Sequence, residues 1–307
     1  MAEMIYDTVV LGGGPAGYTA ALYATRAGLS VLVVEKLSPG GQMTETALIE
    51  NYPGFPQGID GFSLGAEMQG GAARFGAVTL QAEVREVRLA GTPKRIYTDS
   101  GEILAKTVIL ATGAVHKHLG IEDEQRLVGR GVGYCATCDG MFFRGKTVAV
   151  VGGGNSAAAD ALYLSKICQK VYLIHRREEL RATKIYHEPL MRAENVEFCW
   201  NSRVIELLSD TKLSGVVLEN TQSSAQRTLP LDGLFISIGR SPATALFKDQ
   251  LALDDSGYII ADESTKTSVA GVFAAGDVRA KPLRQIVTAT ADGAVAAHFA
   301  EEYLTGI

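Results

Sequence analysis

Two cysteines separated by two residues precede an aspartate, in the stretch Cys135-Ala-Thr-Cys138-Asp139. Two thiols at this spacing can close a small disulfide ring, and such pairs often have a lowered thiolate pKa. Asp139 is suited to act as a general acid that protonates a departing thiolate, although it also suits a helix N-cap or a turn before Gly140. We interpret the segment as a dithiol/disulfide redox centre with Cys135, Cys138 and Asp139 as its catalytic residues.

Half of a zinc site, or two unrelated thiols, are the alternative interpretations of this pair. Zinc normally needs a second close pair of ligands, but Cys168 and Cys199 are far from Cys138 and from each other in the sequence. His116 and His118 form an H-x-H without a matching partner pattern. We therefore expect no metal site. Cys168 falls in an apolar helical stretch and Cys199 in a strand-like one, so we expect both to be small buried hydrophobes.

The elements that must position this chemistry come from an internal repeat. The first copy is a strand at Thr8–Leu11, a glycine turn at Gly12–Gly17, a helical stretch at Tyr18–Ala27 and a second strand at Val31–Glu35. A continuous apolar run bounded by glycine is typical of a buried parallel strand. Strand, glycine turn, helix and strand in this order form the context that a dinucleotide-binding fingerprint requires.

The second copy follows at a constant offset. Gly152 follows Gly12 by 140 residues, and His175 follows Glu35 by the same 140 residues. The second helical stretch is expected over Ala158–Gln169. In each turn the first glycine makes the tight bend, the second lets the backbone approach a pyrophosphate, and the third position packs the helix on the sheet. Ala157 occupies the third position of the second copy as an allowed variant.

The two copies differ where the second strand ends. Glu35 ends that strand in the first copy, and a carboxylate there accepts hydrogen bonds from a ribose 2′-hydroxyl, as in FAD or NAD. The second copy has His175-Arg176-Arg177 at this point and Arg181 shortly after. Guanidinium groups bind a 2′-phosphate bidentately, so we expect the second copy to prefer NADPH over NADH. The alternative is a solvated, arginine-rich helix start.

Composition excludes several classes of protein. The 307 residues carry a net charge of −5, so nothing indicates the basic surface of a nucleic-acid or membrane-surface binder. We find no apolar run of the roughly 18 residues that a membrane span needs and expect no export signal, which predicts a cytoplasmic protein. The 34 glycines exceed the usual share of about 7%, as positive-φ turns and close backbone approaches would require.

Taken together, these motifs resemble the bacterial-type, low-molecular-weight thioredoxin reductases over nearly the whole chain. Cys-Ala-Thr-Cys-Asp-Gly at 135–140 is the most specific match. The second glycine turn and the arginine motif resemble the NADPH-domain motifs of that family. Pro39-Gly-Gly41-Gln42 and Ile49-Glu-Asn51-Tyr-Pro-Gly54 resemble its flavin-proximal segment. Further resemblances lie at Leu110–Gly113, at Gly271–Asp277 and at Leu283–Ile286, the last closing over the flavin ring in the family.

The resemblance implies an α/β fold with two Rossmann-like dinucleotide-binding domains. A discontinuous FAD-binding domain would span residues 1–114 and 244–307, and the NADPH-binding domain at 115–243, which carries the cysteine pair, would be inserted into it. The fingerprint and the resemblance together assign FAD binding to Gly12, Gly14, Pro15, Ala16, Gly17, Glu35, Lys36, Gly41, Gln42, Asn51, Thr112, Gly113, Gly276, Asp277, Arg284, Gln285 and Ile286. They assign NADPH binding to Gly152, Gly154, Asn155, Ser156, Ala157, His175, Arg176, Arg177 and Arg181.

The function implied by the resemblance is electron transfer from NADPH through FAD to the Cys135–Cys138 disulfide and on to thioredoxin. It also implies a homodimer and a rotation of one domain against the other, because the dithiol and the nicotinamide must reach the same flavin in turn. Another small dithiol protein as substrate, or a flavin redox sensor that turns over poorly, remains an alternative. The chain departs from many relatives at Ala159, where an acidic residue is common, and keeps only Asp160.

Overall fold

The computed structural model describes residues 4–46 and 48–306, and residues 1–3, at the start of the segment searched for an export signal, lie outside this part. The chain divides into two compact units: Met1–Val115 with Ser241–Ile307, and His116–Arg240. These bounds differ from the predicted domain limits by one residue at the first crossing and three at the second. Among the described residues, no helix is long and apolar enough to cross a membrane.

The first unit is built on a mixed sheet whose central strands are parallel. The strand order is β3-β2-β1-β6-β5-β4, and β17 pairs with the end of β6. β1, β2, β3, β6 and β17 run parallel, whereas β5 is antiparallel to β4 and to β6. The strands are β1 (Ile5–Leu11), β2 (Val31–Glu35), β3 (Val78–Gln81), β4 (Val84–Arg88), β5 (Lys94–Thr98), β6 (Gly101–Leu110) and β17 (Val272–Ala274).

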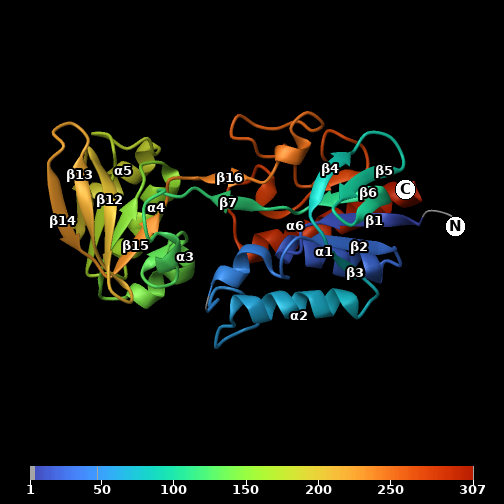
Figure 1. Cartoon of the computed structure of the whole chain (residues 1–307), viewed down its shortest axis with the longest axis horizontal. Coiled ribbons are helices and arrows are strands. Elements are labelled where there is room, and N and C mark those ends of the chain that lie inside the picture. Colours follow the sequence, from blue (N-terminus) through green and yellow to red (C-terminus); the bar gives the residue numbers. More distant parts are fainter. Residues whose placement is uncertain (1–3, 47, 307) are drawn as a thin grey trace. The chain divides into compact units, whose positions relative to one another are not determined.

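Helices α1 (Pro15–Arg26) and α6 (Ile286–Thr305) pack side by side against this sheet, and α2 (Gly61–Ala73) packs on α1 (Figure 1). Pro15 at the first helical position sets φ for α1, which therefore starts three residues before the predicted helix. A capping box formed by Gln285 and Thr288 begins α6, and Gly306 in the left-handed region ends it. Short 3-10 turns η1 (Gly41–Glu45), η5 (Ala245–Phe247) and η6 (Gly276–Val278) complete the unit.

The second unit repeats the first architecture in smaller form. A fully parallel sheet has the order β11-β10-β9-β15-β8, and β12, β13 and β14 form an antiparallel sheet beside it. The strands are β8 (Val132–Gly133), β9 (Thr147–Val151), β10 (Lys170–Ile174), β11 (Val196–Cys199), β12 (Ser202–Ser209), β13 (Leu213–Asn220), β14 (Gln226–Pro230) and β15 (Gly233–Ile236). Its helical elements are η2 (Gln125–Leu127), α3 (Ala136–Asp139), η3 (Gly140–Phe143), α4 (Asn155–Ser165), η4 (Lys184–Tyr186) and α5 (His187–Arg192).

The chain leaves the first unit through β7 (Ala114–His116) and returns through β16 (Arg240–Pro242), and these two strands pair with each other. The predicted fold class, α/β with two Rossmann-like units, is confirmed. One local expectation is wrong: Cys168 does not lie on the crossover helix, because α4 ends at Ser165. Cys168 and Cys199 are nevertheless both free and buried, as predicted.

The contact between α1 and α6 generates a stability prediction. A Cβ atom added to Gly293 in α6 would lie 2.2 Å from the carbonyl oxygen of Ala16, so Gly293→Ala must push the two helices apart. Forcing one methyl into such a contact costs about 1–3 kcal/mol. We expect urea unfolding to show this loss.

Gly70→Ala is the matched control. Gly70 is an exposed residue of α2, and an added Cβ there meets no atom within 4 Å. Removing a helical glycine should raise the free energy of unfolding by about 0.5–1 kcal/mol. Equal effects of the two substitutions would show that the α1–α6 contact is not limiting.

Candidate functional site

The first glycine turn, between β1 and α1, is too tightly packed for side chains. Gly12 has φ of 106°, and an added Cβ would lie 2.4 Å from the carbonyl oxygen of Ala111 at the end of β6. An added Cβ on Gly17 would lie 1.9 Å from the carbonyl oxygen of Gly12. Gly14 faces open space instead, with no atom within 4 Å of an added Cβ. The turn is therefore closed on its inner side and open where the backbone N–H groups that start α1 are exposed.

Glu35 reaches back from the end of β2 to this turn. The backbone N–H of Gly13 donates to Glu35 Oε2 at 2.6 Å, and that of Leu37 donates to Oε1 at 3.0 Å. Each carboxylate oxygen has a second lone pair, which can accept a hydrogen bond from a ribose hydroxyl. Lys36, the next predicted residue, points elsewhere: its ammonium is exposed and pairs with Glu83 at 2.9 Å.

Segments distant in the sequence converge on the same turn. An added Cβ on Gly41 would lie 3.4 Å from Gly14 Cα, and Gly40 N donates to the carbonyl oxygen of Gly13 at 2.8 Å, so η1 lies against the turn. An added Cβ on Gly276 would lie 2.9 Å from Ala16 Cβ, which brings η6, including Asp277, beside the start of α1. The structure thus brings together four parts of the predicted flavin site: the turn at residues 12–17, Glu35, Gly41 and the pair Gly276 and Asp277.

Three hydrogen bonds link most of the remaining predicted flavin residues to segments distant in the sequence. Asn51 Nδ2 donates to Gln285 Oε1 at 3.1 Å, just before Ile286 begins α6. Gln42 Nε2 donates to the carbonyl oxygen of Ala114, and Thr112 Oγ1 donates to that of Ala243 at 2.9 Å, beside Gly113.

These features fit a dinucleotide. Among the residues that the structure describes, no side chain caps the N-terminus of α1, so its N–H groups are available to a phosphate. The Arg284 guanidinium stacks 4.0 Å above the Tyr258 ring, and its Nε is buried without a hydrogen-bond partner among the described residues. An orphaned buried donor costs free energy unless a ligand satisfies it.

The second glycine turn, between β9 and α4, repeats this construction. An added Cβ on Gly152 would lie 2.3 Å from the carbonyl oxygen of Ser237 at the end of β15, and Gly154 again faces open space. Within the described part of the chain no side chain caps α4, whose first residues are Asn155, Ser156 and the buried Ala157. Asn155 instead accepts a hydrogen bond from the backbone N–H of Thr183 at 2.8 Å.

His175 occupies the place that Glu35 has in the first copy. Its ring lies so close to the turn that an added Cβ on Gly153 would be 2.2 Å from it, and its Nε2 is buried without a partner among the described residues. Burial, together with the charges of Arg181, Arg177 and Arg176, lowers the pKa of His175. The imidazole is therefore neutral at pH 7, and it packs against the backbone of the turn at Gly153.

The three arginines surround this end of β10. Arg176, Arg177 and Arg181 are all exposed, and the backbone N–H of Arg181 donates to the carbonyl oxygen of Gly153 at 2.7 Å. The segment that carries Arg181 is thereby fixed to the glycine turn. This arrangement provides guanidinium groups beside an open helix N-terminus, as binding of a phosphorylated ribose requires.

Sequence reasoning missed Ser237 and the environment of Asp160. Ser237 Oγ donates a short hydrogen bond to Asp160 Oδ2, and burial raises the pKa of Asp160. The bond joins α4 to the end of β15, where Ser237 also closes the glycine turn. The only signal in the sequence was the expected departure from the family at Ala159, next to which Asp160 remains.

Cys135 and Cys138 are joined by a disulfide, with their Cα atoms 5.3 Å apart. With the sulfurs bonded to each other, neither cysteine presents a thiolate to a metal in this state. The described residues contain no group of three or more His, Cys, Asp or Glu side chains placed to hold a metal. Asp139 is largely buried next to the pair, and this burial raises its pKa to about 6. A carboxyl group with that pKa can carry a proton close to neutral pH.

A polar cluster that the sequence did not reveal flanks the disulfide. Glu124 is buried and accepts hydrogen bonds from the hydroxyl of Tyr134 at 2.7 Å and from the backbone N–H of Gly120 at 2.9 Å. His118 Nδ1 lies 2.8 Å from the same hydroxyl, and the His116 ring stacks on the Tyr134 ring. The H-x-H pattern therefore serves to hold the residue before Cys135.

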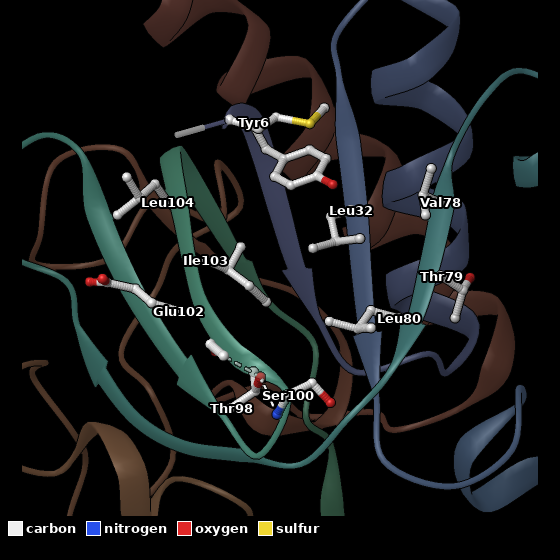
Figure 2. Close-up of a pocket in the computed structure, with 12 residues that line it drawn as sticks. Tyr6, Leu32, Val78, Thr79, Leu80, Thr98, Ser100, Glu102, Ile103 and Leu104 are labelled. Carbon is white, nitrogen blue, oxygen red and sulfur yellow. Dashed lines mark hydrogen bonds between the residues drawn. The ribbon is translucent and has the colours of Figure 1, made fainter. Parts of the chain in front are cut away.

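An open pocket of about 410 Å³ in the first unit is separate from these sites (Figure 2). Figure 2 shows Tyr6, Leu32 and Leu80 from neighbouring parallel strands directed into it, opposite Ile103 on β6. Its lining is mostly apolar and includes none of the predicted site residues.

Three comparisons with known proteins point to the same family over nearly the whole chain. Residues 6–293 match the model of the pyridine nucleotide-disulphide oxidoreductase family. The chain is 46% identical to the thioredoxin reductase of Listeria monocytogenes, over 98% of this chain and 95% of that protein. The crystal structure of the thioredoxin reductase from Streptococcus pyogenes is similar with a TM-score of 0.92 and 42% identity, over 100% of both chains. A thioredoxin reductase from Giardia duodenalis has the same TM-score of 0.92 at 36% identity, over 99% of this chain and 100% of that chain.

The raised pKa of Asp139 predicts a pH-dependent effect of Asp139→Asn. The folded protein holds this proton more tightly than the unfolded chain, whose Asp pKa is near 3.8, so the contribution of Asp139 to stability is present below pH 4 and is lost as the pH rises through about 6. The amide cannot ionise and has no such loss. Between pH 4 and 8 the stability of Asp139→Asn relative to the wild type should therefore rise by on the order of 1–3 kcal/mol.

Urea unfolding of the oxidised proteins at both pH values measures this difference. A constant difference between the variant and the wild type from pH 4 to pH 8 would contradict the raised pKa.

Proposed function

Because this chain belongs to the pyridine nucleotide-disulphide oxidoreductase family and to its thioredoxin reductases, we propose that it is an NADPH-dependent thioredoxin-disulfide reductase that uses FAD. The observation that carries the proposal is the disulfide Cys135–Cys138 in the same unit as the second of two glycine turns of the same construction. A bound flavin would accept two electrons from the nicotinamide and pass them to this disulfide. We further propose a homodimer from the family resemblance alone, and we retain the sequence-based proposal that the protein is cytoplasmic.

The cysteine pair would perform the protein-directed half of the reaction. Once reduced, one thiolate attacks a sulfur of the thioredoxin disulfide and forms a mixed disulfide, and the other cysteine then displaces the second thioredoxin sulfur. The Cys135–Cys138 bond forms again, and thioredoxin leaves with two thiols. Asp139, with its pKa of about 6, would supply a proton to a departing thiolate, because a buried carboxyl group is protonated in part at neutral pH.

The rest of the chain would bind and orient the cofactors. In the first unit, the N-terminus of α1 would hold the FAD pyrophosphate and Glu35 the ribose, whereas Asp277, Arg284 and Gln285 would contact the flavin end. In the second unit, the N-terminus of α4 would hold the NADPH pyrophosphate, and Arg176, Arg177 and Arg181 would bind the 2′-phosphate.

We propose that the family's domain rotation takes place at the two crossings. Gly113, just before β7, has φ of 71°, and Gly239, just before β16, has φ of 108°. Glycine at both positions permits backbone conformations that other residues rarely adopt, as a hinge that changes φ and ψ requires.

Reduction of a bacterial thioredoxin by the purified protein with NADPH tests the proposed function. Cys138→Ser removes one of the two exchanging sulfurs, so it should lower thioredoxin reduction by on the order of a thousandfold or more. Bleaching of the flavin by NADPH should remain. The matched control is Cys168→Ala, which replaces a buried free cysteine and should retain wild-type turnover.

Full thioredoxin reduction by Cys138→Ser would contradict the proposed exchange through both cysteines. If the wild type bleaches with NADPH but does not reduce thioredoxin, another small dithiol protein is the substrate. If NADPH does not bleach the flavin, the chain is a sensor rather than a reductase.

Nucleotide preference provides an independent prediction. Arg177→Ala removes charge-assisted hydrogen bonds to the 2′-phosphate, which are worth about 1.5–3 kcal/mol each, so KM for NADPH should rise by about 10- to 100-fold while KM for NADH changes little. Arg203→Ala is the control, because Arg203 is exposed in the same unit and pairs with Glu219 instead. Steady-state kinetics with both nucleotides measure the effect, and equal efficiency with NADH and NADPH in wild type and variant would refute the assignment.

A further inference from the structure

Three charged side chains are buried together within the first unit, where α6 packs on the residues before it, and none of them belongs to the predicted cofactor site. The side chains of Arg279, Lys281 and Asp292 have exposed fractions of 6%, 5% and 9%. Burying charges is costly unless they are paired and hydrogen-bonded. We therefore ask which part of the structure this buried cluster holds in place.

Asp292 is the hub of the cluster. Its Oδ1 accepts a hydrogen bond from an Arg279 terminal nitrogen and its Oδ2 one from Arg279 Nε, each at 2.9 Å, so the pair is bidentate. Oδ2 also accepts from Lys281 Nζ at 2.7 Å and from the backbone N–H of Gly276 at 2.9 Å. Burial alone would raise the pKa of Asp292, but the hydrogen bonds from Arg279 and Lys281 outweigh it and hold this pKa below its usual value.

The partners of the hub tie down both ends of one segment, residues 276–288. The bond to the Gly276 N–H fixes the start of η6. At the other end, Lys281 Nζ donates a second hydrogen bond to the carbonyl oxygen of Thr288 in the first turn of α6, at 3.1 Å. The carbonyl oxygen of Arg279 accepts a weaker bond from Arg284 at 3.4 Å. The tied segment contains five of the predicted flavin-site residues, namely Gly276, Asp277, Arg284, Gln285 and Ile286.

The hub also lies next to the first glycine turn. An added Cβ on Gly276 would lie 2.9 Å from Ala16 Cβ, and one on Gly293, the residue after Asp292, would lie 2.2 Å from the carbonyl oxygen of Ala16. Both Gly276, which donates to Asp292, and the helix position after Asp292 therefore lie against the start of α1. The cluster connects the two places where the proposed function puts the dinucleotide.

We propose that Asp292, Arg279 and Lys281 are positioning residues that hold residues 276–288 in their dinucleotide-binding conformation before the cofactor arrives. The inference rests on the proposed function, because it takes a flavin dinucleotide as the ligand of this segment. Preorganisation strengthens binding because the apparent dissociation constant is the intrinsic one divided by the fraction of molecules in the competent conformation. Lys281 is the separable member, since without it the bidentate pair of Asp292 and Arg279 remains.

The test compares FAD binding by full-length apoproteins. Lys281→Met removes the bonds to Asp292 and Thr288, so the segment should be competent in only a fraction of molecules. If that fraction falls to about a tenth, the dissociation constant for FAD, measured by quenching of FAD fluorescence, rises about tenfold. Lys281→Arg keeps a cation with several donors and should restore binding to within about threefold of the wild type.

Lys94→Met separates positioning from general loss of stability. Lys94 is also buried in the first unit, and its Nζ donates to three carbonyl oxygens, of Leu89, Gly91 and Ala270, outside the tied segment. Lys94→Met should lower the urea midpoint of the apoprotein and leave FAD affinity within about twofold of the wild type. Equal weakening of FAD binding in Lys94→Met and Lys281→Met, or unchanged binding in Lys281→Met, would overturn the inference.

Hydrogen exchange of the wild-type apoprotein gives a test that needs no variant. The amides of Gly276, Gln285 and Thr288, which donate hydrogen bonds within this region, should be protected before FAD is added. If they exchange freely in the apoprotein while the β1 and β6 amides are protected, the segment is not preorganised and the inference fails. A wild-type apoprotein that does not bind FAD at all would instead refute the proposed function, and the two failures are therefore distinguishable.

Discussion

The structure depends on one steric constraint that appears twice. In each unit the chain leaves the first strand so close to the end of the neighbouring strand that a Cβ at the first turn position would lie 2.4 Å from Ala111 O or 2.3 Å from Ser237 O. Only glycine fits there, and the close approach turns the next helix so that its uncapped N-terminus faces open space. Phosphate binding by both units, as we propose it, follows from this packing.

The side chain that packs against each glycine turn, Glu35 in the first unit and His175 in the second, distinguishes the two units. In the first, the Glu35 carboxylate accepts a hydrogen bond from the N–H of Gly13 and can accept one from a ribose hydroxyl as well. In the second, a neutral imidazole lies against Gly153, and three exposed arginines surround it. The carboxylate would repel a 2′-phosphate, whereas the arginines attract one. The same backbone construction is thus suited to two different dinucleotides, with the disulfide in the unit that we assign to NADPH.

Features that depend on local pattern could be predicted from the sequence, whereas features that depend on distant contacts could not. The repeat of apolar strands and glycine turns indicated two dinucleotide-binding units, because each lies within a short stretch of chain, and the family resemblance then implied the fold class. The burial of His175 was not predictable, since it depends on how closely β10 approaches Gly153. Asp292 carries no sequence signal either, because its partners come from a loop and meet it only when α6 packs on α1. Cys168 was misplaced because apolar residues continue past the end of α4.

The most direct measurement of the central claim counts thiols at named cysteines. The protein, reconstituted with FAD, is incubated anaerobically with NADPH, alkylated under denaturing conditions and analysed by peptide mass spectrometry. We predict that Cys135 and Cys138 become alkylated together and only when NADPH is present, whereas Cys168 and Cys199 are alkylated with and without it. A Cys135–Cys138 disulfide that persists after NADPH has bleached the flavin would contradict electron transfer to this pair.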